Sequence, residues 1–420
     1  MKILKLAPYY FPEQVSSTHL TKDLEEACIK AGMNMEIYAP TPTRGINDDI
    51  REKYKKIKYE EFRNGHIKLH RFNMFPEKRN PIVRGIRYIL VNFIQYVKSL
   101  KAKDIDVIFA GSTPPTQGIL CAMVKKKLSK KYGHDVKYIY NLQDIFPDSL
   151  VYTGLCKESS ILYKIGDKIM NYTYKNADKI IVISEEFKNI LLRRGISEDK
   201  IEVIYNWIDE KKIQYVARED NKLFDEYNLD RDKFYIAYSG NIGLTQNMDM
   251  LLEIADHIKD NKNIGIILVG DGAYKEQVKN TIKEKALDNV KLLPFQPYER
   301  ISEVFSLGDI SLIISKKGVA KNSLPGKTWG YMAAKRPVLA SFDKDSELTR
   351  IIEKNECGIC VDANDKENLQ KAILELSNKD IAYLGENGRK YIKNNLTKNV
   401  CTKKYVDIIK EIVKRGKDNE

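Results

Sequence analysis

Short apolar runs alternate with longer stretches of helical periodicity along the first half of the chain. The runs have the length of buried strands, and helical pattern fills most of the gaps between them, as in Thr18–Ala31. Strands that alternate with helices predict a parallel, doubly wound sheet. The expected strands are Ile3–Ala7, Met35–Ala39, Asp106–Ala110, Val136–Leu142 and Lys179–Ser184.

The same alternation returns after a charged, less regular stretch that follows Tyr205. We expect a first domain over residues 1–205, a second over 206–385, and a C-terminal helix over 386–420 that crosses back to the first domain. The expected fold class is α/β, with two Rossmann-like doubly wound parallel sheets that face one cleft. The expected strands of the second domain are Tyr235–Ser239, Gly265–Val269, Val290–Pro294, Ile310–Ser315, Val338–Ser341 and Ile359–Val361.

Turns at the carboxyl ends of such strands are where ligands bind, so they are the informative segments. The glycine-rich turn Gly240–Gly243 follows one strand, and Gly270–Gly272 follows the next. Lys327 comes directly after the turn Pro325–Gly326, at the predicted start of a short helix. A lysine and free N–H groups at such turns favour phosphate binding, although an ordinary loop–helix–strand unit would also contain these residues.

The net charge of +13 is unevenly distributed. Residues 1–185 contain 31 Lys and Arg against 20 Asp and Glu, whereas residues 186–420 contain 40 against 38. A basic half beside a nearly neutral half indicates a surface that meets an anionic partner, with nucleic acid and anionic lipid as the candidates.

One stretch of the basic half resembles an amphipathic helix. Between Arg79 and Lys103 the chain has six basic residues and no acidic one, and apolar residues recur there at helical spacing. This pattern is typical of a helix that lies on a membrane surface, but an apolar stripe that packs on the sheet is an equally open interpretation. The membrane contacts that we expect are Arg84, Ile86, Arg87, Ile89 and Phe93.

The six cysteines favour a cytoplasmic protein. They are scattered, and only Cys357 and Cys360 have C-x-x-C spacing, with no second pair and no histidine beside them, so we expect no zinc site. The N-terminus is interrupted by Pro8, which favours a first buried strand over a signal peptide. No apolar run is long enough to span a bilayer. We therefore expect a cytoplasmic protein that is peripheral on the inner face of the plasma membrane.

Four stretches resemble the retaining glycosyltransferases of family 4, which have the GT-B fold. They are P-Y-Y-F-P-E at Pro8–Glu13, N-L-Q-D-I-F-P-D at Asn141–Asp148, Y-N-W-I-D at Tyr205–Asp209, and S-G-N-I-G-L-T-Q at Ser239–Gln246 together with the segment around Lys327. They span nearly the whole chain in the family's order. The chain looks most similar to the subgroup that builds bacterial capsule, colanic-acid and O-antigen repeats, including N-acetyl-fucosamine transferases.

The resemblance implies a role for each motif. The donor's diphosphate would be bound by Gly240, Asn241, Gly243, Gln246 and Lys327, and the nucleotide or sugar by Gly272, Phe295 and Glu347. The acceptor side would comprise Glu13, Ser16, Ser17, Gln143 and Asp144, and the catalytic residues would be Asp144 and Lys327. Transfer with retention needs no enzyme nucleophile, and a lysine at the leaving diphosphate would make a metal unnecessary, so we expect no cofactor.

The chain departs from the family's pattern at several positions. Many members carry a glutamate pair at the places that are Asn322 and Gly330 here, which leaves the ribose contact open, with Glu347 as a conceivable substitute. Gln143 replaces a histidine, and Asn241 and Gln246 replace an arginine and a lysine. Lys327 is therefore the strongest candidate for a positive charge at the diphosphate.

The function expected from these features is transfer of a sugar from a UDP-linked or related donor to a lipid-linked glycan of the undecaprenyl-diphosphate type, on an anionic membrane surface. A sugar-nucleotide epimerase with the same fold is an alternative, but none of the five histidines lies in these motifs. A nucleic-acid-binding protein is the second alternative, but the basic residues lie on an apolar helix and we find no zinc finger or aromatic RNA-binding motif, so we expect no nucleic-acid partner.

Overall fold

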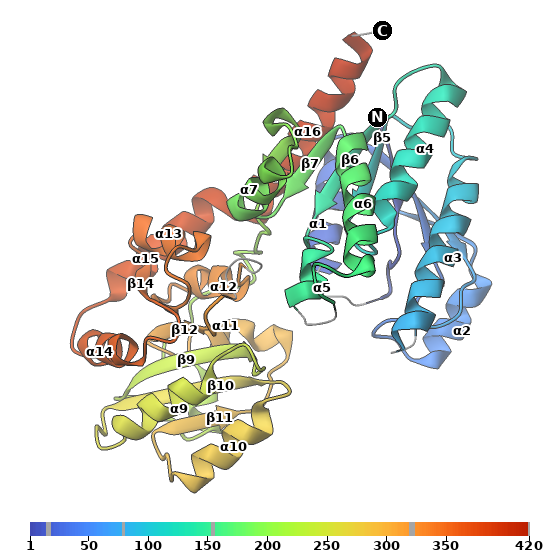
Figure 1. Ribbon diagram of the computed structural model, residues 1–420. Coiled ribbons are helices and arrows are strands. Elements are labelled where there is room, and N and C mark those ends of the chain that lie inside the picture. Colours follow the sequence, from blue (N-terminus) through green and yellow to red (C-terminus); the bar gives the residue numbers. More distant parts are fainter. Residues whose placement is uncertain (14–17, 78–79, 153–155, 319–323, 419–420) are drawn as a thin grey trace. The chain divides into compact units, whose positions relative to one another are not determined.

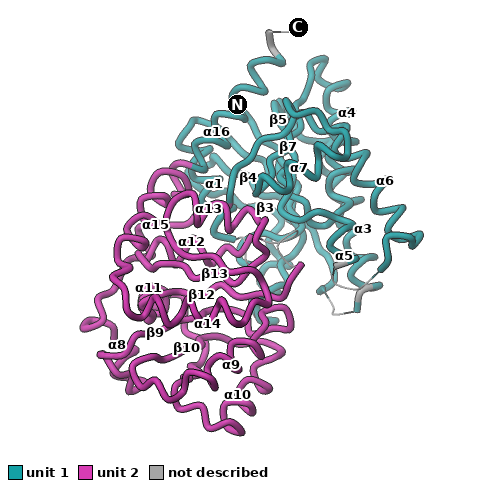
Figure 2. The backbone as a smooth tube through the Cα atoms, turned by 60° about the vertical axis from the view of Figure 1, so that its left-hand side comes forward, with its two compact units in different colours: residues 1–205, 401–420 teal, residues 206–400 magenta. Residues whose placement is uncertain are grey.

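The computed structural model describes residues 1–13, 18–77, 80–152, 156–318 and 324–418 (Figure 1). The chain forms two compact units, unit 1 with residues 1–205 and 401–420, and unit 2 with residues 206–400 (Figure 2). The C-terminal segment predicted over 386–420 divides between them. Helix α15 (Ala382–Asn395) belongs to unit 2, whereas α16 (Lys398–Asp418) belongs to unit 1 from residue 401 onward.

Unit 1 is built on an eight-stranded sheet in the order β3-β4-β2-β1-β5-β6-β7-β8. All neighbouring strands are parallel except the edge pair β3 and β4, which is antiparallel. The strands are β1 (Lys2–Leu6), β2 (Asn34–Pro40), β3 (Tyr59–Phe62), β4 (Ile67–Phe72), β5 (Val107–Gly111), β6 (Lys137–Leu142), β7 (Lys179–Val182) and β8 (Ile201–Val203).

Helices cover both faces of this sheet. Figure 1 shows α3, α4 and α6 side by side over one face, and α4 packs against both neighbours. The apolar side chains of the central strands are fully buried, as expected for a parallel sheet covered on both sides. The helices are α1 (Thr18–Lys30), α2 (Asp48–Lys56), α3 (Pro81–Ser99), α4 (Gln117–Tyr132), α5 (Asp148–Tyr152), α6 (Ile161–Asn176) and α7 (Glu185–Arg193).

Unit 2 has a six-stranded, all-parallel sheet in the order β11-β10-β9-β12-β13-β14. The strands are β9 (Phe234–Asn241), β10 (Ile264–Asp271), β11 (Val290–Leu293), β12 (Ile310–Ile314), β13 (Val338–Ser341) and β14 (Gly358–Val361). The remaining helices are α8 (Lys222–Glu226), α9 (Met248–His257), α10 (Lys275–Glu284), α11 (Ile301–Phe305), α12 (Lys327–Ala333), α13 (Glu347–Lys354) and α14 (Lys366–Leu376).

The order of the strands fixes where each sheet can bind a ligand. In unit 2 the chain runs outward from β9 to β11 and then returns to the other side of β9 with β12. The carboxyl ends of β9 and β12 therefore flank a topological switch point, where open α/β sheets bind their ligands. In unit 1 the corresponding switch lies between β1 and β5.

The structure confirms two parallel-sheet α/β domains, and every predicted strand is present to within about two residues. The sequence reasoning missed α2, β3 and β4. Strand β3 reads Y-E-E-F and is half exposed at the sheet edge, so it lacks the apolar signal of a central strand.

Candidate functional site

The end of β9 and the turn that follows it lie against the end of β10 and its turn, with no room for side chains between them. A Cβ atom added at Gly270 would lie 1.9 Å from the carbonyl oxygen of Gly240, and one added at Gly272 would lie 2.3 Å from that of Ile242. Both distances are far below a van der Waals contact, so glycine is required where these backbones meet. The result is a close-packed backbone surface, exposed at Gly240 and Asn241, beside the switch point of unit 2.

Lys327 lies directly over this surface. Its ammonium nitrogen is 3.6 Å from the ring centroid of Tyr238 and 3.7 Å from the place that a Cβ of Gly240 would occupy. Within the described residues, no carboxylate lies within ion-pair distance of this ammonium group. Burial lowers the pKa of Lys327 to about 7. The structure thus brings Lys327 and Gly240 together, as the sequence predicts, and the described residues offer this cation no carboxylate partner.

The turn is held by one hydrogen bond to the end of β10 and by one to the side chain of Gln246. The N–H of Ile242 donates to the carbonyl of Asp271 at 2.8 Å, and the N–H of Gly243 donates to the side-chain oxygen of Gln246 at 3.0 Å. These two N–H groups are therefore occupied in the free structure. Helix α12 is only seven residues long, so its dipole adds little. The lysine charge is the stronger anion-binding feature of the site.

Tyr331 is a site residue that the sequence reasoning missed. Its buried hydroxyl lies 2.9 Å from the N–H of Ser239, 3.0 Å from the Ser239 hydroxyl and 3.1 Å from the Ser239 carbonyl oxygen. These bonds fix α12 to the end of β9 and so position Lys327. The signal was available, because Tyr331 is four residues after Lys327 and therefore on the same face of α12. Tyr238 likewise shares a strand face with Gly240, two residues later.

The predicted nucleotide contacts are distributed along the same edge of the sheet. Gly272 and the exposed Phe295 follow β10 and β11, and the buried Glu347 opens α13 after β13. Gly330 is packed in the core, where an added Cβ would lie 2.2 Å from the ring of Phe305. A carboxylate could not stand there without rearranging α12. Asn322, the other position of the missing glutamate pair, lies outside the described residues.

On unit 1, Asp144 is exposed directly after β6, beside the half-buried Gln143. The surrounding atoms still remove part of the water from its carboxyl group, and this desolvation raises its pKa above the usual value. Gln143 is fixed by its N–H, which donates to the Ser112 hydroxyl at 3.1 Å, and by its amide, which donates to the Asn141 side chain at 3.1 Å. These residues form a polar edge at the carboxyl ends of β5 and β6.

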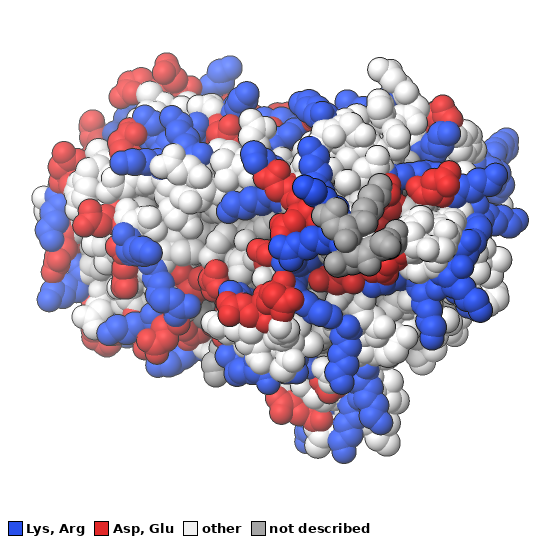
Figure 3. Space-filling view, turned by 90° about the horizontal axis from the view of Figure 1, so that it is seen from above, with Lys and Arg blue, Asp and Glu red and all other residues white. Residues whose placement is uncertain are grey.

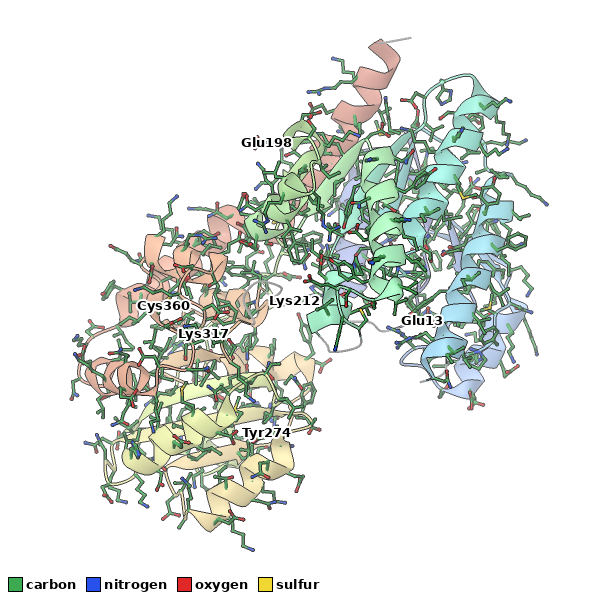
Figure 4. All side chains as sticks on the ribbon, viewed as in Figure 1. Glu13, Glu198, Lys212, Tyr274, Lys317 and Cys360 are labelled. Carbon is green, nitrogen blue, oxygen red and sulfur yellow. The ribbon has the colours of Figure 1, made fainter. Side chains whose placement is uncertain are left out.

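Glu13 does not belong to this polar edge as an open carboxylate. This residue, labelled in Figure 4, is buried. Its oxygens accept hydrogen bonds from the N–H groups of Tyr10, Thr43 and Arg44 and from the Thr43 hydroxyl. The prediction of an acceptor contact is therefore corrected: Glu13 joins the loop after β1 to the loop after β2. Ser16 and Ser17, also predicted on the acceptor side, lie outside the described residues.

Helix α3 turns its apolar side away from the sheet. Ile89 and Phe93 are 63% and 64% exposed, and Ile82, Ile86, Leu90 and Val97 are exposed on the same stripe. The opposite side is buried and mostly polar: Gln95 donates to the carbonyls of Ala7 and Tyr38, both at 2.9 Å. The interpretation in which the stripe packs on the sheet is therefore wrong. Within the described residues, no helix has the length and apolar composition to span a membrane.

Arg87 is a second correction. The sequence predicts a membrane contact for Arg87, but its side chain is fully buried on the inner side of α3 and donates to the carbonyl of Phe75 at 3.1 Å. Arg87 lies four residues before Val91 and eight before Gln95. Residues at these spacings share one side of a helix, so Arg87 belongs to the buried side of α3. Arg84 is half-buried and stays a candidate for the outer surface.

Two families match the chain in succession. Residues 18–212 match the family described as Glycosyltransferase Family 4, and residues 219–398 match Glycosyl transferases group 1. The boundary between the matches, at residues 213–218, lies shortly after the change from unit 1 to unit 2 at residue 205. The first match contains Asp144, and the second contains the glycine turn and Lys327.

Individual relatives are similar over most of their length. A probable glycosyltransferase, WbjE, of Pseudomonas aeruginosa is 25% identical over 81% of this chain and 83% of its own. The putative colanic acid biosynthesis glycosyl transferase WcaI of Escherichia coli is 22% identical over 98% of this chain and 100% of its own. An N-acetylgalactosaminyltransferase of Campylobacter jejuni, which is named for a diphospho-undecaprenol acceptor, is 23% identical over 59% of this chain and 62% of its own. In fold, HepE of Anabaena in complex with UDP superposes with a TM-score of 0.68 at 15% identity, over 98% of this chain and 100% of its own.

Proposed function

Because this chain is a glycosyltransferase with a family 4 domain followed by a group 1 domain, we propose that it transfers a sugar from a nucleoside-diphosphate donor to a lipid-linked glycan in bacterial surface polysaccharide synthesis. The names of WcaI and of the Campylobacter relative support the pathway and the lipid-linked acceptor. The bound UDP of HepE supports a uridine nucleotide as the leaving group.

The observation that carries the donor site is the position of Lys327 over Gly240. As the bond between the sugar and the diphosphate breaks, negative charge grows on the departing phosphate. An ammonium group that has no carboxylate partner in the described residues, and that lies at a close-packed glycine turn, is placed to stabilise that charge. Asn241, on this turn, and Gln246, three residues after it, would donate to the same phosphates through their amide groups.

Transfer with retention would use few groups of the enzyme. The acceptor hydroxyl would attack the anomeric carbon from the side on which the diphosphate leaves, and the proton of that hydroxyl would pass to the departing phosphate oxygen. Asp144, on the acceptor side, would orient the acceptor sugar or stabilise the positive charge of the oxocarbenium-like state. With Lys327 at the diphosphate, we propose that no metal ion is needed, so turnover should survive chelation of divalent cations.

The outward apolar stripe of α3 supports a peripheral location on the membrane. An exposed row of six large apolar residues in a helix without acidic residues is unusual for a surface that meets only water. Such a helix lies in the interface of a bilayer, with its apolar side among the lipid chains. A lipid-linked acceptor would then be met at the same surface.

The test is a transfer assay with purified protein, a panel of nucleotide sugars and a bacterial lipid extract. We expect one nucleotide sugar to release its nucleoside diphosphate while the mass of a lipid-linked glycan increases by one sugar residue, also in the presence of EDTA. Nuclear magnetic resonance of the product should show the anomeric configuration of the donor. A product of inverted configuration would contradict the mechanism, and an isomerised donor without transfer would contradict the function.

A further inference from the structure

A second exposed apolar cluster lies at the start of α6. Ile161, Leu162 and Ile165 are 77%, 54% and 53% exposed, in the first two turns of the helix. The buried side of the same helix carries Gly166, Met170 and Tyr174, so the helix is already packed and the cluster is not part of its core. Single exposed apolar residues are common on proteins, but three neighbours on one helix form a patch that needs an explanation.

The patch belongs to the same face of unit 1 as the stripe of α3. Helices α3, α4 and α6 lie side by side over the sheet, with α4 in the middle (Figure 1). Helices α4 and α6 approach closely at Gly118, where an added Cβ would lie 2.1 Å from the Thr173 side chain. Met123 is also exposed, on α4, the helix that packs against both α3 and α6.

The charge of these helices is almost entirely basic. Together they contain eleven Lys and Arg and one acidic residue, Asp167, which pairs with Arg194. Lys164 and Lys168 are exposed beside the apolar patch of α6, and Lys126, Lys127 and Lys130 are exposed on α4. Figure 3 shows basic side chains gathered toward the right-hand edge of its view, with few acidic ones between them. Apolar residues among lysines complement an anionic lipid surface, whereas two copies of such a face would repel each other.

Helix α6 is also joined to the segment that carries Asp144. A Cβ added at Gly166 would lie 2.7 Å from the ring of Phe146 and 2.9 Å from Pro147. The Tyr163 hydroxyl donates to Asp148 at 2.7 Å. The first turns of α6 therefore pack directly on the loop that follows Asp144. A surface that binds the outer side of these turns would lie close to the polar edge at the carboxyl ends of β5 and β6.

We propose that the start of α6 is a second membrane-docking element, which acts with α3 to hold this face of unit 1 on an anionic bilayer and so brings the Gln143–Asp148 loop to the lipid surface. The proposal rests on the membrane association in the proposed function and extends it. If only α3 touched the bilayer, unit 1 could rotate about the axis of α3. Two contacts, one on each side of α4, fix the orientation of unit 1 on the bilayer. The glycan of a lipid-linked acceptor would then project toward the loop that contains Asp144.

The test is sedimentation with vesicles of phosphatidylcholine, with or without phosphatidylglycerol, using the full chain. The α6 variant carries Ile161→Ser, Leu162→Ser and Ile165→Ser, and the α3 variant carries Ile86→Ser, Ile89→Ser and Phe93→Ser. A matched control replaces two exposed aromatics of unit 2, with Tyr298→Ser and Tyr383→Ser. We expect the α6 variant to lose about tenfold or more in its partition onto phosphatidylglycerol vesicles, since three exposed apolar side chains no longer enter the interface.

A charge variant separates the two components of the contact. Lys164→Glu with Lys168→Glu should weaken binding to phosphatidylglycerol vesicles by about tenfold or more at low salt, with little effect at high salt or on neutral vesicles. The unit 2 control should bind like the wild type. Equal melting temperatures of all variants would show that the losses come from the surface and not from unfolding.

Three other outcomes would each contradict the docking role of α6. If the α6 variant binds like the wild type while the α3 variant is released, α6 has no docking role and the membrane association through α3 stands. If the wild type binds neither kind of vesicle, both membrane proposals are wrong, and stabilisation by nucleotide shows separately whether the donor site survives. If the wild type is a dimer by light scattering and the α6 variant a monomer, the face covers a second copy and the proposal is wrong.

Discussion

The ammonium group of Lys327 lies 3.6 Å from the centre of the Tyr238 ring, on the open side of Gly240. The ring supplies an electron-rich surface to the cation, and this contact holds the lysine at the turn before any phosphate arrives. A carboxylate in the same place would compete with the donor for the lysine, whereas an aromatic ring does not. The relationship therefore explains how a lysine can be partly buried and still be available to an anion.

Replacing Lys327 with alanine should reduce turnover by about a hundredfold to a thousandfold, which is the usual cost of removing one group that stabilises a developing negative charge. The measurement is the initial rate of transfer at saturating donor. Lys371, an exposed lysine on α14, provides the matched control, and Lys371→Ala should keep the wild-type rate. Comparable rates for the two variants would remove Lys327 from the mechanism.

Donor binding should take up protons above neutral pH. The pKa of Lys327 is about 7 in the free protein, so the side chain is mostly neutral above pH 7 and must gain a proton when a diphosphate binds. Below pH 7 it is already charged and no uptake is expected. Calorimetry of UDP binding at pH 8 in two buffers of different ionisation enthalpy measures this uptake. Lys327→Met should abolish it, and uptake that persists in this variant would contradict the assignment.

The same lysine affects stability with a defined sign. Its pKa is lower in the folded protein than the ordinary value near 10.4, so the unfolded chain binds more protons between about pH 7 and pH 10. The contribution of Lys327 to the free energy of unfolding therefore rises with pH across this window. Urea unfolding of the wild type and of Lys327→Met should show a smaller rise for the variant. If the free energy of unfolding changed with pH equally in both proteins, the pKa of Lys327 would not be lowered in the folded state.

Tyr331→Phe should weaken both stability and donor binding. Loss of the hydroxyl leaves the buried backbone groups of Ser239 without their partner, which costs about 1–3 kcal/mol of unfolding free energy. The start of α12 also loses its attachment to β9, so the Kd for UDP should increase. Tyr140→Phe is a suitable control, because the buried Tyr140 hydroxyl has no hydrogen-bond partner among the described residues and its removal should be neutral or stabilising.

The two sides of α3 should respond differently to substitution. The exposed residues Ile86, Ile89 and Phe93 can be replaced by serine with little change in melting temperature, since they make few contacts. Val91 is on the buried side of the same helix, and its replacement by alanine should lower the free energy of unfolding by about 1–3 kcal/mol. Thermal unfolding of both variants tests the orientation of the helix. A strongly destabilised triple variant would mean that the stripe is core.

Much of the geometry of the candidate donor site was predictable because it follows from local rules. The turn Gly240–Gly243 and Lys327 lie at the carboxyl ends of predicted strands, and the ends of parallel strands meet at one edge of a sheet. Their proximity in the structure therefore follows from the strand order. The ring of Tyr238 and the hydroxyl of Tyr331 were within reach of the same rules, through strand alternation and helical spacing.

Other features depend on pairs of residues far apart in the sequence. The inner side of α3 is polar because Asn92 and Gln95 meet Gln117 on α4, which lies more than twenty residues away. Without that network, an apolar stripe is more easily interpreted as a core side, and Arg87 is more easily placed on the surface. The role of Glu13 depends in the same way on the loop around Thr43, thirty residues later.

The most direct test of a donor site at Lys327 is thermal stabilisation by a panel of UDP, GDP, ADP, TDP and CMP, measured on the wild type and on Lys327→Ala. A ligand at a hundredfold excess over its Kd stabilises the folded state by about 2.7 kcal/mol, which raises the melting temperature measurably. We predict a clear increase with one nucleoside diphosphate, UDP, and a much smaller increase in the variant. An equal increase in both proteins, or none with any nucleotide, would contradict a donor site built around Lys327.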